Sequence, residues 1–272
     1  MGQLDGKIAV VTGAGSGMGR AGSVAFAREG AAVVLAELDP ERGEHVAAAI
    51  RAEGGRALAV PTDVTSGEAV AAMVERAVAE FGAVDVLYHC AVDVHFVNHR
   101  DTRLTEMDDA VWQRMLDLVL TGTFHVCKHV GRQMLRQRRG SIVLTATTDA
   151  LIGVAGLDAY TAAKGGVIAL TRSFAAGMAP DGVRVNAVCP AFVATEPQML
   201  WLDDPAARAA IQSLHLLPIP SPEEVVPFVV FLASDASSAM TGGIHPVDAG
   251  YLAFKAASVD VMGAMQIGRD EA

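Results

Sequence analysis

Lys7-Ile-Ala-Val-Val11-Thr-Gly-Ala-Gly-Ser-Gly-Met-Gly19 is the stretch of sequence on which the fold of this chain depends. The apolar run up to Val11 predicts a short buried strand, and a helical pattern from Arg20 to Glu29 follows the glycines. Glycines let the backbone approach a pyrophosphate closely, while the free N–H groups and positive dipole end of a helix stabilise its charge. This order predicts a phosphate site in a dinucleotide-binding fold, with a glycine-rich turn that binds nothing as the alternative.

The spacing of the glycines follows Thr-Gly-x-x-x-Gly-x-Gly, which is more selective than Gly-x-Gly-x-x-Gly. The second form fails because Met18 and Arg20 stand where its third glycine would fall. The loop residues that we expect to bind a cofactor are Gly13, Ser16, Gly17, Met18 and Gly19.

A second apolar strand, 32–36, ends at Glu37, at the distance from the loop where a dinucleotide fold places the acid for the adenosine ribose. The Glu37 carboxylate can accept both ribose hydroxyls and would repel a 2′-phosphate. Neither Ser16 nor Leu38 supplies a cation to offset that repulsion, so NAD is favoured over NADP. The alternative is a solvated carboxylate at a strand end.

Further along, the chain reads Asp158-Ala-Tyr-Thr-Ala-Ala-Lys-Gly-Gly166. The four-residue spacing places the phenol of Tyr160 and the ammonium of Lys164 on one helix face. A fixed cation nearby favours the phenolate and lowers a tyrosine pKa from its usual value of roughly 10. Together with the glycine loop, this pair predicts proton transfer beside a bound dinucleotide.

These motifs make the chain resemble the short-chain dehydrogenase/reductase family from about Leu4 to Gly250. The resemblance implies that Tyr160 is the general acid-base and that Lys164 holds the nicotinamide ribose while lowering the tyrosine pKa. Thr147 stands at the place of the family's substrate-orienting serine, and its hydroxyl can still donate to a substrate oxygen. The further cofactor contacts implied by family position are Asp63, Val64, Ala91, Pro190, Phe192, Val193 and Thr195.

Three positions depart from the family pattern. His89-Cys-Ala-Val92 replaces Asn-Asn-Ala-Gly, Pro190-Ala replaces Pro-Gly, and Val119 stands in place of the family's catalytic asparagine. In the family that asparagine helps to hold a helix irregularity whose main-chain carbonyl binds a water of the proton relay. We expect the Val119 carbonyl to keep this position, supported by neighbours such as Thr121 and Gly122.

Outward from these motifs, strands near 7–12, 32–37, 56–60, 84–89, 140–146, 183–188 and 244–247 alternate with helical patterns. This order predicts an α/β fold with a single doubly wound parallel sheet of the Rossmann type and helices on both faces, within one domain spanning 1–272. Helix starts are predicted at Thr65-Ser-Gly-Glu68 and at Ser221-Pro-Glu-Glu224. The ligand belongs at the carboxyl ends of the strands.

Charge and composition argue against several classes of function. The net charge is −10 and there is no long basic run, which argues against a nucleic-acid partner. No apolar run reaches membrane-spanning length and the N-terminus lacks an apolar signal core, so we expect a cytoplasmic protein with no membrane contact. The odd cysteines Cys90, Cys127 and Cys189 are read as reduced packing residues, and His89, His95 and His99 lack the partners of a metal site.

The segment 192–220 is long and apolar and is expected to form a substrate lid, which favours a hydrophobic alcohol or ketone; the alternative is packing of two lid helices on the body. The predicted pocket residues are Leu151, Ile152, Val154, Met199, Leu200 and Trp201, with Asp149 either tuning the pocket charge or capping a helix. The tail, 251–272, either crosses to a neighbouring subunit or frays, and we expect a homo-oligomer, a tetramer rather than a dimer.

We therefore predict an NAD(H)-dependent oxidoreductase that interconverts a hydrophobic secondary alcohol and its ketone by hydride transfer, with Tyr160 as general acid-base. The alternative is a cofactor-binding scaffold or regulatory subunit of the same fold whose catalysis has decayed. The departures from the family pattern at Val119 and at His89-Cys90 favour that alternative.

Overall fold

The computed structural model describes residues 2–253 and contains a seven-stranded parallel sheet in the order β3-β2-β1-β4-β5-β6-β7. The strands are β1 (Ile8–Thr12), β2 (Ala32–Glu37), β3 (Arg56–Pro61), β4 (Val86–His89), β5 (Gly140–Thr145), β6 (Val183–Pro190) and β7 (Ile244–Val247). The predicted sheet is confirmed, and every predicted strand end lies within two residues of the observed one. The strand order reverses between β1 and β4, which creates the crevice where such sheets bind ligands.

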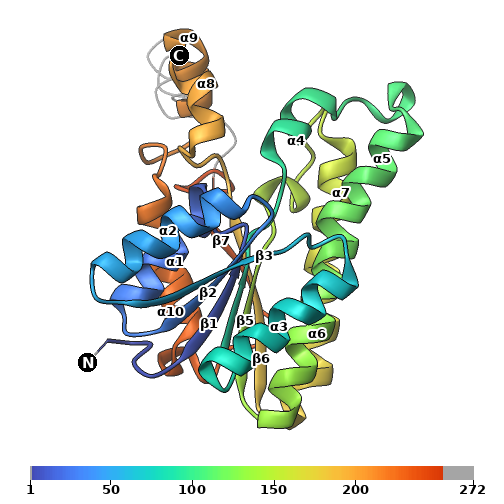
Figure 1. Cartoon of the computed structure of the whole chain (residues 1–272). Helices are drawn as coiled ribbons and strands as arrows, with labels where there is room; N and C mark the ends of the chain where they lie inside the picture. The colour runs from blue at the N-terminus through green and yellow to red at the C-terminus, as the bar shows by residue number, and fades with distance from the viewer. Residues whose placement is uncertain (1, 254–272) are drawn as a thin grey trace, which may run out of the picture.

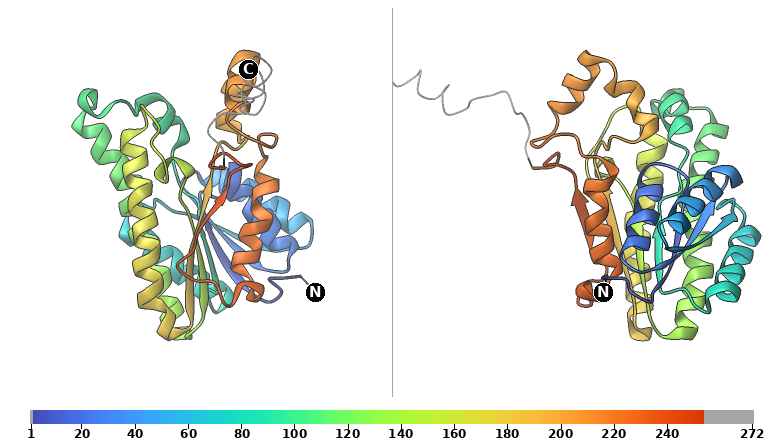
Figure 2. Two further views of the ribbon diagram at one scale, coloured as in Figure 1. Left: turned by 180° about the vertical axis from the view of Figure 1, so that it is seen from behind. Right: turned by 60° about the vertical axis from the view of Figure 1, so that its left-hand side comes forward.

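Helices cover both faces of the sheet, as Figures 1 and 2 show. On one face lie α1 (Gly17–Arg28), α2 (Pro40–Ala52) and α10 (Pro222–Ala233), and on the other α3 (Gly67–Phe81), α6 (Gly122–Gln137) and α7 (Asp158–Met178). Strand β2 shows why the sheet is apolar throughout: Val34 packs into one core and Leu35 into the other. A strand covered on both faces needs apolar side chains at consecutive positions.

The remaining elements lie mostly toward the carboxyl ends of the strands. Helices α4 (Val94–Arg100) and α5 (Asp109–Met115) stand above the sheet on one side, and the lid helices α8 (Met199–Leu202) and α9 (Pro205–Gln212) rise on the other (Figure 1). A π-helical turn, Leu116–Thr121, joins α5 to α6. Short 3₁₀ turns span Leu104–Glu106, Thr148–Ala150, Ala179–Asp181, Glu196–Gln198 and Asp235–Ser237.

Helix starts follow the predicted capping chemistry with small shifts. Ser221 and Glu224 form the predicted capping box at the start of α10. Helix α3 is capped by Ser66, whose hydroxyl accepts from the Ala69 N–H at 3.2 Å, one residue later than predicted. Helix α1 begins at Gly17, three residues earlier than its apolar pattern indicates, so its free N–H groups belong to the glycine loop itself.

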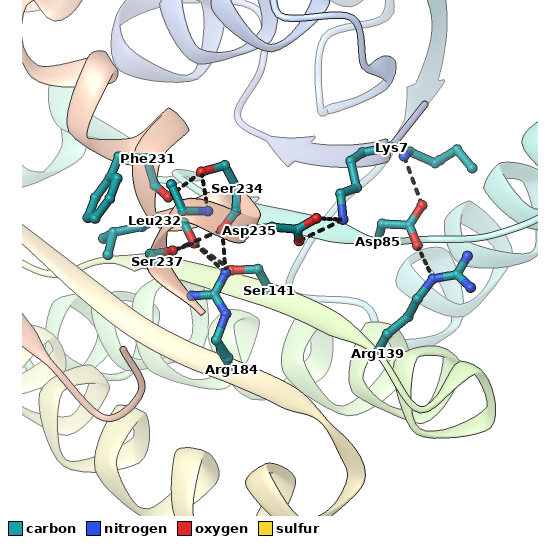
Figure 3. A network of polar contacts seen from close by, with 12 residues as sticks. Lys7, Asp85, Arg139, Ser141, Arg184, Phe231, Leu232, Ser234, Asp235 and Ser237 are labelled. Carbon is teal, nitrogen blue, oxygen red and sulfur yellow. Dashed lines mark hydrogen bonds and ion pairs between the residues drawn. The ribbon is translucent and has the colours of Figure 1, made fainter. Parts of the chain in front are cut away.

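At the amino ends of the strands, a polar network ties the sheet together (Figure 3). The buried Asp85 carboxylate accepts from the first N–H of β1 at 3.1 Å and from Arg139 Nε at 2.8 Å. Arg184 donates to two main-chain carbonyls near the end of α10 at 2.9 Å, and Lys7 pairs with Asp235 at 2.8 Å. Lys7, Arg139 and Arg184 line a cavity of about 360 Å³. Each of these cations already has a hydrogen-bond acceptor within the protein, so this end of the molecule is structural.

Within residues 2–253, no helix is long and apolar enough to cross a membrane. The predicted subunit-crossing tail falls mostly in 254–272, outside the described residues.

Candidate active site

A cavity of about 590 Å³ opens at the carboxyl ends of the strands, where the crevice was predicted. It is bounded by the glycine loop, the ends of β2, β4, β5 and β6, the start of α7 and the base of the lid. The predicted residues that line it are Gly13, Ser16, Gly17, Met18, Gly19, Glu37, Asp63, Val64, Ala91, Thr147, Tyr160, Lys164, Pro190, Val193 and Thr195. Phe192 does not line it, although its neighbours on both sides do.

The glycine loop has a shape that only glycine allows. Gly13 has φ 63°, and a Cβ there would lie 2.8 Å from the Cα of Ala91. A Cβ on Gly19 would overlap the carbonyl oxygen of Gly13, and Gly17 has φ 50°. The backbone therefore approaches the cavity without side chains and presents the first N–H groups of α1 to it. This cradle fits the pyrophosphate of a dinucleotide.

Glu37 is fixed at one end of the cavity by two backbone donors. Its Oε2 accepts from the N–H of Gly15 at 2.8 Å, and its Oε1 accepts from the N–H of Asp39 at 3.2 Å. Arg42, on the first turn of α2, lines the same end, and its guanidinium lies 3.4 Å from the Asp39 carboxylate. We did not predict Arg42 from the sequence, because it stands five residues after Glu37 and reaches the cavity only through the turn into α2.

Tyr160 and Lys164 lie on one face of α7, as their spacing predicts. The Lys164 Nζ is 5.7 Å from the centroid of the Tyr160 ring. Lys164 is almost fully buried, and its Nζ donates to the carbonyl of Thr145 at the end of β5 at 2.6 Å. The ammonium is therefore held between the sheet and the phenol.

The pKa of Tyr160 moves in the opposite direction to the one expected. Burial raises it above the usual value, the carboxylate of Asp149 raises it further, and the hydroxyl of Thr147 acts the other way. Taking the phenolate out of water is therefore the dominant effect. Burial also lowers the pKa of Lys164 to about 8. Near neutral pH the pair is thus a protonated phenol beside an ammonium ion.

Thr147 is buried next to this pair. Its Oγ1 accepts from the N–H of Asp149 at 3.2 Å and so caps the short turn 148–150. Its hydroxyl acts to lower the pKa of both Tyr160 and Asp149, as a hydroxyl that donates to the charged form does. Of the two roles considered for Asp149, the electrostatic one is supported, since its carboxylate raises the pKa of both Tyr160 and Tyr251.

The start of α7 is capped from a distant loop. Leu157, at the N-cap position, offers no side-chain acceptor, and the Asp101 carboxylate takes that place by accepting from Tyr160 N at 2.8 Å and from Ala159 N at 3.2 Å. Nothing in the local sequence indicates this contact, since Asp101 precedes Tyr160 by 59 residues.

The base of the lid crosses the cavity. The Glu196 carboxylate accepts from Gly17 N at 3.0 Å and pairs with Arg20 at 2.6 Å, while Gln198 accepts from Asn98 of α4 at 3.2 Å. This segment therefore connects the glycine loop with α4, and sequence reasoning did not identify it.

The predicted substrate residues are not among the residues that line this cavity. Leu151, Ile152, Met199, Leu200 and Trp201 are exposed, and Asp149 and Val154 are partly buried. The lid helices α8 and α9 rise above the sheet (Figure 1), and none of their residues lines the cavity. The substrate end is bounded instead by Val92, Val94, His95, Leu118, Pro197 and Gln198.

The three histidines after β4 do not converge. His89 points into the core, whereas His95 lines the cavity and its ring stacks on that of His99 at 4.1 Å. Among the described residues, no group of three His, Cys, Asp or Glu side chains is arranged to hold a metal ion.

Comparison with known proteins identifies the family. A family model described as enoyl-(acyl carrier protein) reductase matches residues 13–252. The chain is 43% identical to cis-4-hydroxycyclohexanecarboxylate dehydrogenase of Sinomonas cyclohexanicum, covering 91% of this chain and 97% of the relative. It is 34% identical to a 3-oxoacyl-[acyl-carrier-protein] reductase of Thermotoga maritima, covering 91% and 98%.

A solved structure gives the same result. Carveol dehydrogenase from Mycobacterium avium in complex with NAD superimposes with a TM-score of 0.84 at 32% identity, covering 93% of this chain and all of that one. The matches run through the glycine loop, the Tyr160/Lys164 pair and the closing strand. This chain belongs to the short-chain dehydrogenase/reductase family of oxidoreductases.

Proposed function

We propose that this oxidoreductase uses NAD(H) to interconvert a hydrophobic secondary alcohol and its ketone, with Tyr160 as the general acid-base. The observation that carries the proposal is one cavity that joins the glycine cradle and Glu37 at one end to Thr147, Tyr160 and Lys164 at the other.

The residues present fit a nicotinamide dinucleotide. The glycine loop would hold the pyrophosphate, Glu37 the adenosine ribose and Lys164 the nicotinamide ribose. The hydride chemistry would be that of the bound nicotinamide. The Glu37 carboxylate favours NAD over NADP because it would face a 2′-phosphate directly.

The proton chemistry follows from the protonation of the site. In ketone reduction, the protonated Tyr160 would donate to the substrate oxygen while the O–H of Thr147 turns to orient that oxygen. In alcohol oxidation, the Tyr160 phenolate would take the hydroxyl proton. Because burial raises the pKa of Tyr160, we expect reduction to prevail near neutral pH and oxidation to gain as the pH rises.

The substrate class follows from the cavity walls and from two relatives. Val92, Val94, Leu118 and Pro197 make the substrate end largely apolar. Two relatives carry names that refer to alcohols on six-membered carbon rings. Cyclic secondary alcohols and ketones are therefore the first compounds to test, with nicotinamide absorbance as the readout.

The proposal is tested with two tyrosine variants. We expect Tyr160→Phe to lower kcat by at least about 10²-fold with little change in the Kd of NADH, since general acid-base catalysis contributes about 10²–10⁴. Tyr88→Phe is the matched control, because Tyr88 is also buried and its hydroxyl has no hydrogen-bond partner among the described residues. Near-normal turnover in Tyr160→Phe would refute the assigned mechanism.

The second candidate is a catalytically decayed scaffold, favoured by Val119, His89 and Cys90 at positions where the family has asparagine. It predicts NADH binding without turnover on any compound of the panel. We also propose a single-domain cytoplasmic protein that forms a homotetramer, for which analytical ultracentrifugation is the test of assembly.

A further inference from the structure

A buried hydrogen-bond chain runs from the glycine loop to the π-helical turn. His89, at the end of β4, lies with its Nδ1 2.7 Å from Thr12 Oγ1 and its Nε2 3.0 Å from Thr123 Oγ1. Thr123 Oγ1 in turn donates to the carbonyl of Val119 at 2.5 Å. All three polar side chains are at most 3% exposed, so none is satisfied by bulk water.

The donors and acceptors along this series of hydrogen bonds allow only one direction of donation. A threonine hydroxyl has a single hydrogen, and that of Thr123 is directed at the Val119 carbonyl, so Thr123 Oγ1 accepts from His89 Nε2–H. The bare Nδ1 of His89 then accepts the hydrogen of Thr12. Thr12 Oγ1 itself accepts from the N–H of Cys90 at 3.1 Å. Every member is satisfied when the imidazole is neutral and carries its hydrogen on Nε2.

The environment of His89 agrees with this assignment. Burial and, to a smaller extent, the positive charge of Lys164 together lower the pKa of His89 to about 3. A neutral imidazole also avoids a second cation beside the Lys164 ammonium, which the site needs in its charged form.

The hydrogen-bond chain ends at the π-helical turn, which packs tightly against α7. The π-helical turn Leu116–Thr121 contains Val119, and a Cβ on Gly166 would lie 2.9 Å from the Leu120 side chain. Gly166 is only two residues beyond Lys164. On the other side of the π-helical turn, a Cβ on Gly122 would lie 3.0 Å from the Val64 side chain. The turn thus has little free space between α7 and Val64.

We propose that His89 and Thr123 are positioning residues of this active site: by holding the Val119 carbonyl, they fix the π-helical turn against α7 and so place Lys164 and Tyr160. The Val119 side chain has no polar group with which to do this. The Thr123 hydroxyl, on the first turn of α6, bonds the carbonyl directly, and His89 at the end of β4 bonds that hydroxyl. The expected loss of turnover rests on the proposed function, whereas the expected change in structure rests on the geometry alone.

The kinetic test removes one hydroxyl at a time. Thr171 makes the same bond as Thr123, from its Oγ1 to the carbonyl four residues earlier at 2.8 Å, on α7 and fully buried, so Thr171→Val is the matched control. We expect Thr123→Val to lower kcat at least about tenfold on the best substrate, Thr123→Ser to restore it to within about threefold, and Thr171→Val to leave it within about twofold. Equal losses in Thr123→Val and Thr171→Val, or none in Thr123→Val, would overturn the proposal.

The structural test needs no turnover. In ¹⁵N-labelled protein, with His89→Asn used to assign the signal, we expect His89 to be neutral between pH 5 and 8 with a slowly exchanging Nε2–H, in line with its pKa of about 3. Thr123→Val should speed exchange of that hydrogen and of the amides around Lys164, whereas Thr171→Val should leave the His89 hydrogen protected. An Nδ1–H form of His89, or unchanged exchange around Lys164 in Thr123→Val, contradicts the inference. If the wild type turns over no alcohol but passes this test, the proposed function fails and the positioning role stands.

Discussion

At the scale of single residues, the polar groups buried beside the cavity carry most of its chemistry. Burial moves the pKa of Tyr160 up and those of Lys164 and His89 down, and in each case it favours the uncharged form. These shifts make both the activity and the stability of the protein depend on pH.

The His89 imidazole should limit stability at acid pH. Its pKa is about 3 in the folded protein against roughly 6.5 in an unfolded chain. Below pH 6.5 the unfolded chain therefore binds a proton at His89 that the folded protein does not bind. The free energy of unfolding keeps its full value above pH 6.5 and falls as the pH drops toward 3. Relative to His89→Asn, the wild type should lose about 2 kcal/mol of unfolding free energy between pH 7.5 and 5.

Urea unfolding at a series of pH values measures this difference. His99→Asn is the control, since His99 is exposed and its replacement should leave the acid slope unchanged. Parallel pH curves for the wild type and His89→Asn would show that His89 binds a proton equally well in both states.

The cofactor preference should depend on the balance between Glu37 and Arg42. Replacing Glu37 by Ser and Leu38 by Arg removes the carboxylate that would face the ribose and adds a cation, while Arg42 already lines this end of the cavity. We expect the ratio of NADP to NAD affinity to rise at least about tenfold, which corresponds to roughly 1.4 kcal/mol. Calorimetry of both cofactors measures this ratio.

Adding Arg42→Ala to that variant separates the contribution of Arg42 to NADP affinity from that of the arginine introduced at position 38. We expect part of the gained NADP affinity to be lost. Tight NADP binding by the unmodified protein would mean that Arg42, not Glu37, determines the preference.

At the scale of elements, α7 carries the two central residues but cannot cap its own start. Asp101 supplies the missing acceptor from the segment after α4, and the N–H that it holds is that of Tyr160 itself. An acidic group at a helix start also interacts favourably with the helix dipole. The position of Tyr160 therefore depends on a loop far away in the sequence.

We expect Asp101→Ala to lower the unfolding free energy by about 1 kcal/mol, the usual value of a helix cap, and to reduce kcat more than it changes KM. Asp101→Asn, which keeps an acceptor oxygen, should recover most of both. Asp108→Ala removes an equivalent cap from α5, where Asp108 accepts from the Ala110 N–H at 2.8 Å, and should cost stability without lowering kcat. If both alanine variants reduce kcat equally, Asp101 has no special role in placing Tyr160.

At the scale of the whole molecule, the two ends of the sheet have different tasks. The carboxyl ends surround the cavity, and the amino ends are joined by the network around Asp85, Arg139 and Arg184 (Figure 3). Every strand of the parallel sheet points the same way, so the full length of the sheet separates these two sets of residues.

Loss of the network should therefore affect stability alone. Asp85→Ala leaves the first N–H of β1 and the Arg139 guanidinium without their acceptor, and we expect a loss of about 1–3 kcal/mol in the unfolding free energy. Turnover and KM for NADH at a temperature where the variant is folded should stay within about twofold of the wild type. A larger change in KM would show that the two ends of the sheet are coupled.

Much of this protein follows from the sequence by itself, because the signals are local. The glycine loop, the strand at Glu37 and the four-residue spacing of Tyr160 and Lys164 each depend on a few consecutive residues with a fixed backbone period. Apolar runs of five or six residues were enough to predict the strands and their order along the chain. The helix irregularity at Val119 was also predicted, although Thr123 supports it instead of the neighbouring Thr121.

The tertiary structure decided what depends on segments that are far apart in the chain. The Asp101 cap, the contact between His89 and Thr123 and the reach of Arg42 into the cavity arise only when the sheet and its helices are assembled. The same is true of the raised pKa of Tyr160, because desolvation depends on every atom packed around the phenol and not on the spacing of one cation. Leu200, Leu214, Leu216 and Leu217 of the lid have the composition of a pocket wall, yet they are exposed, since hydrophobicity alone does not specify which surface a side chain covers.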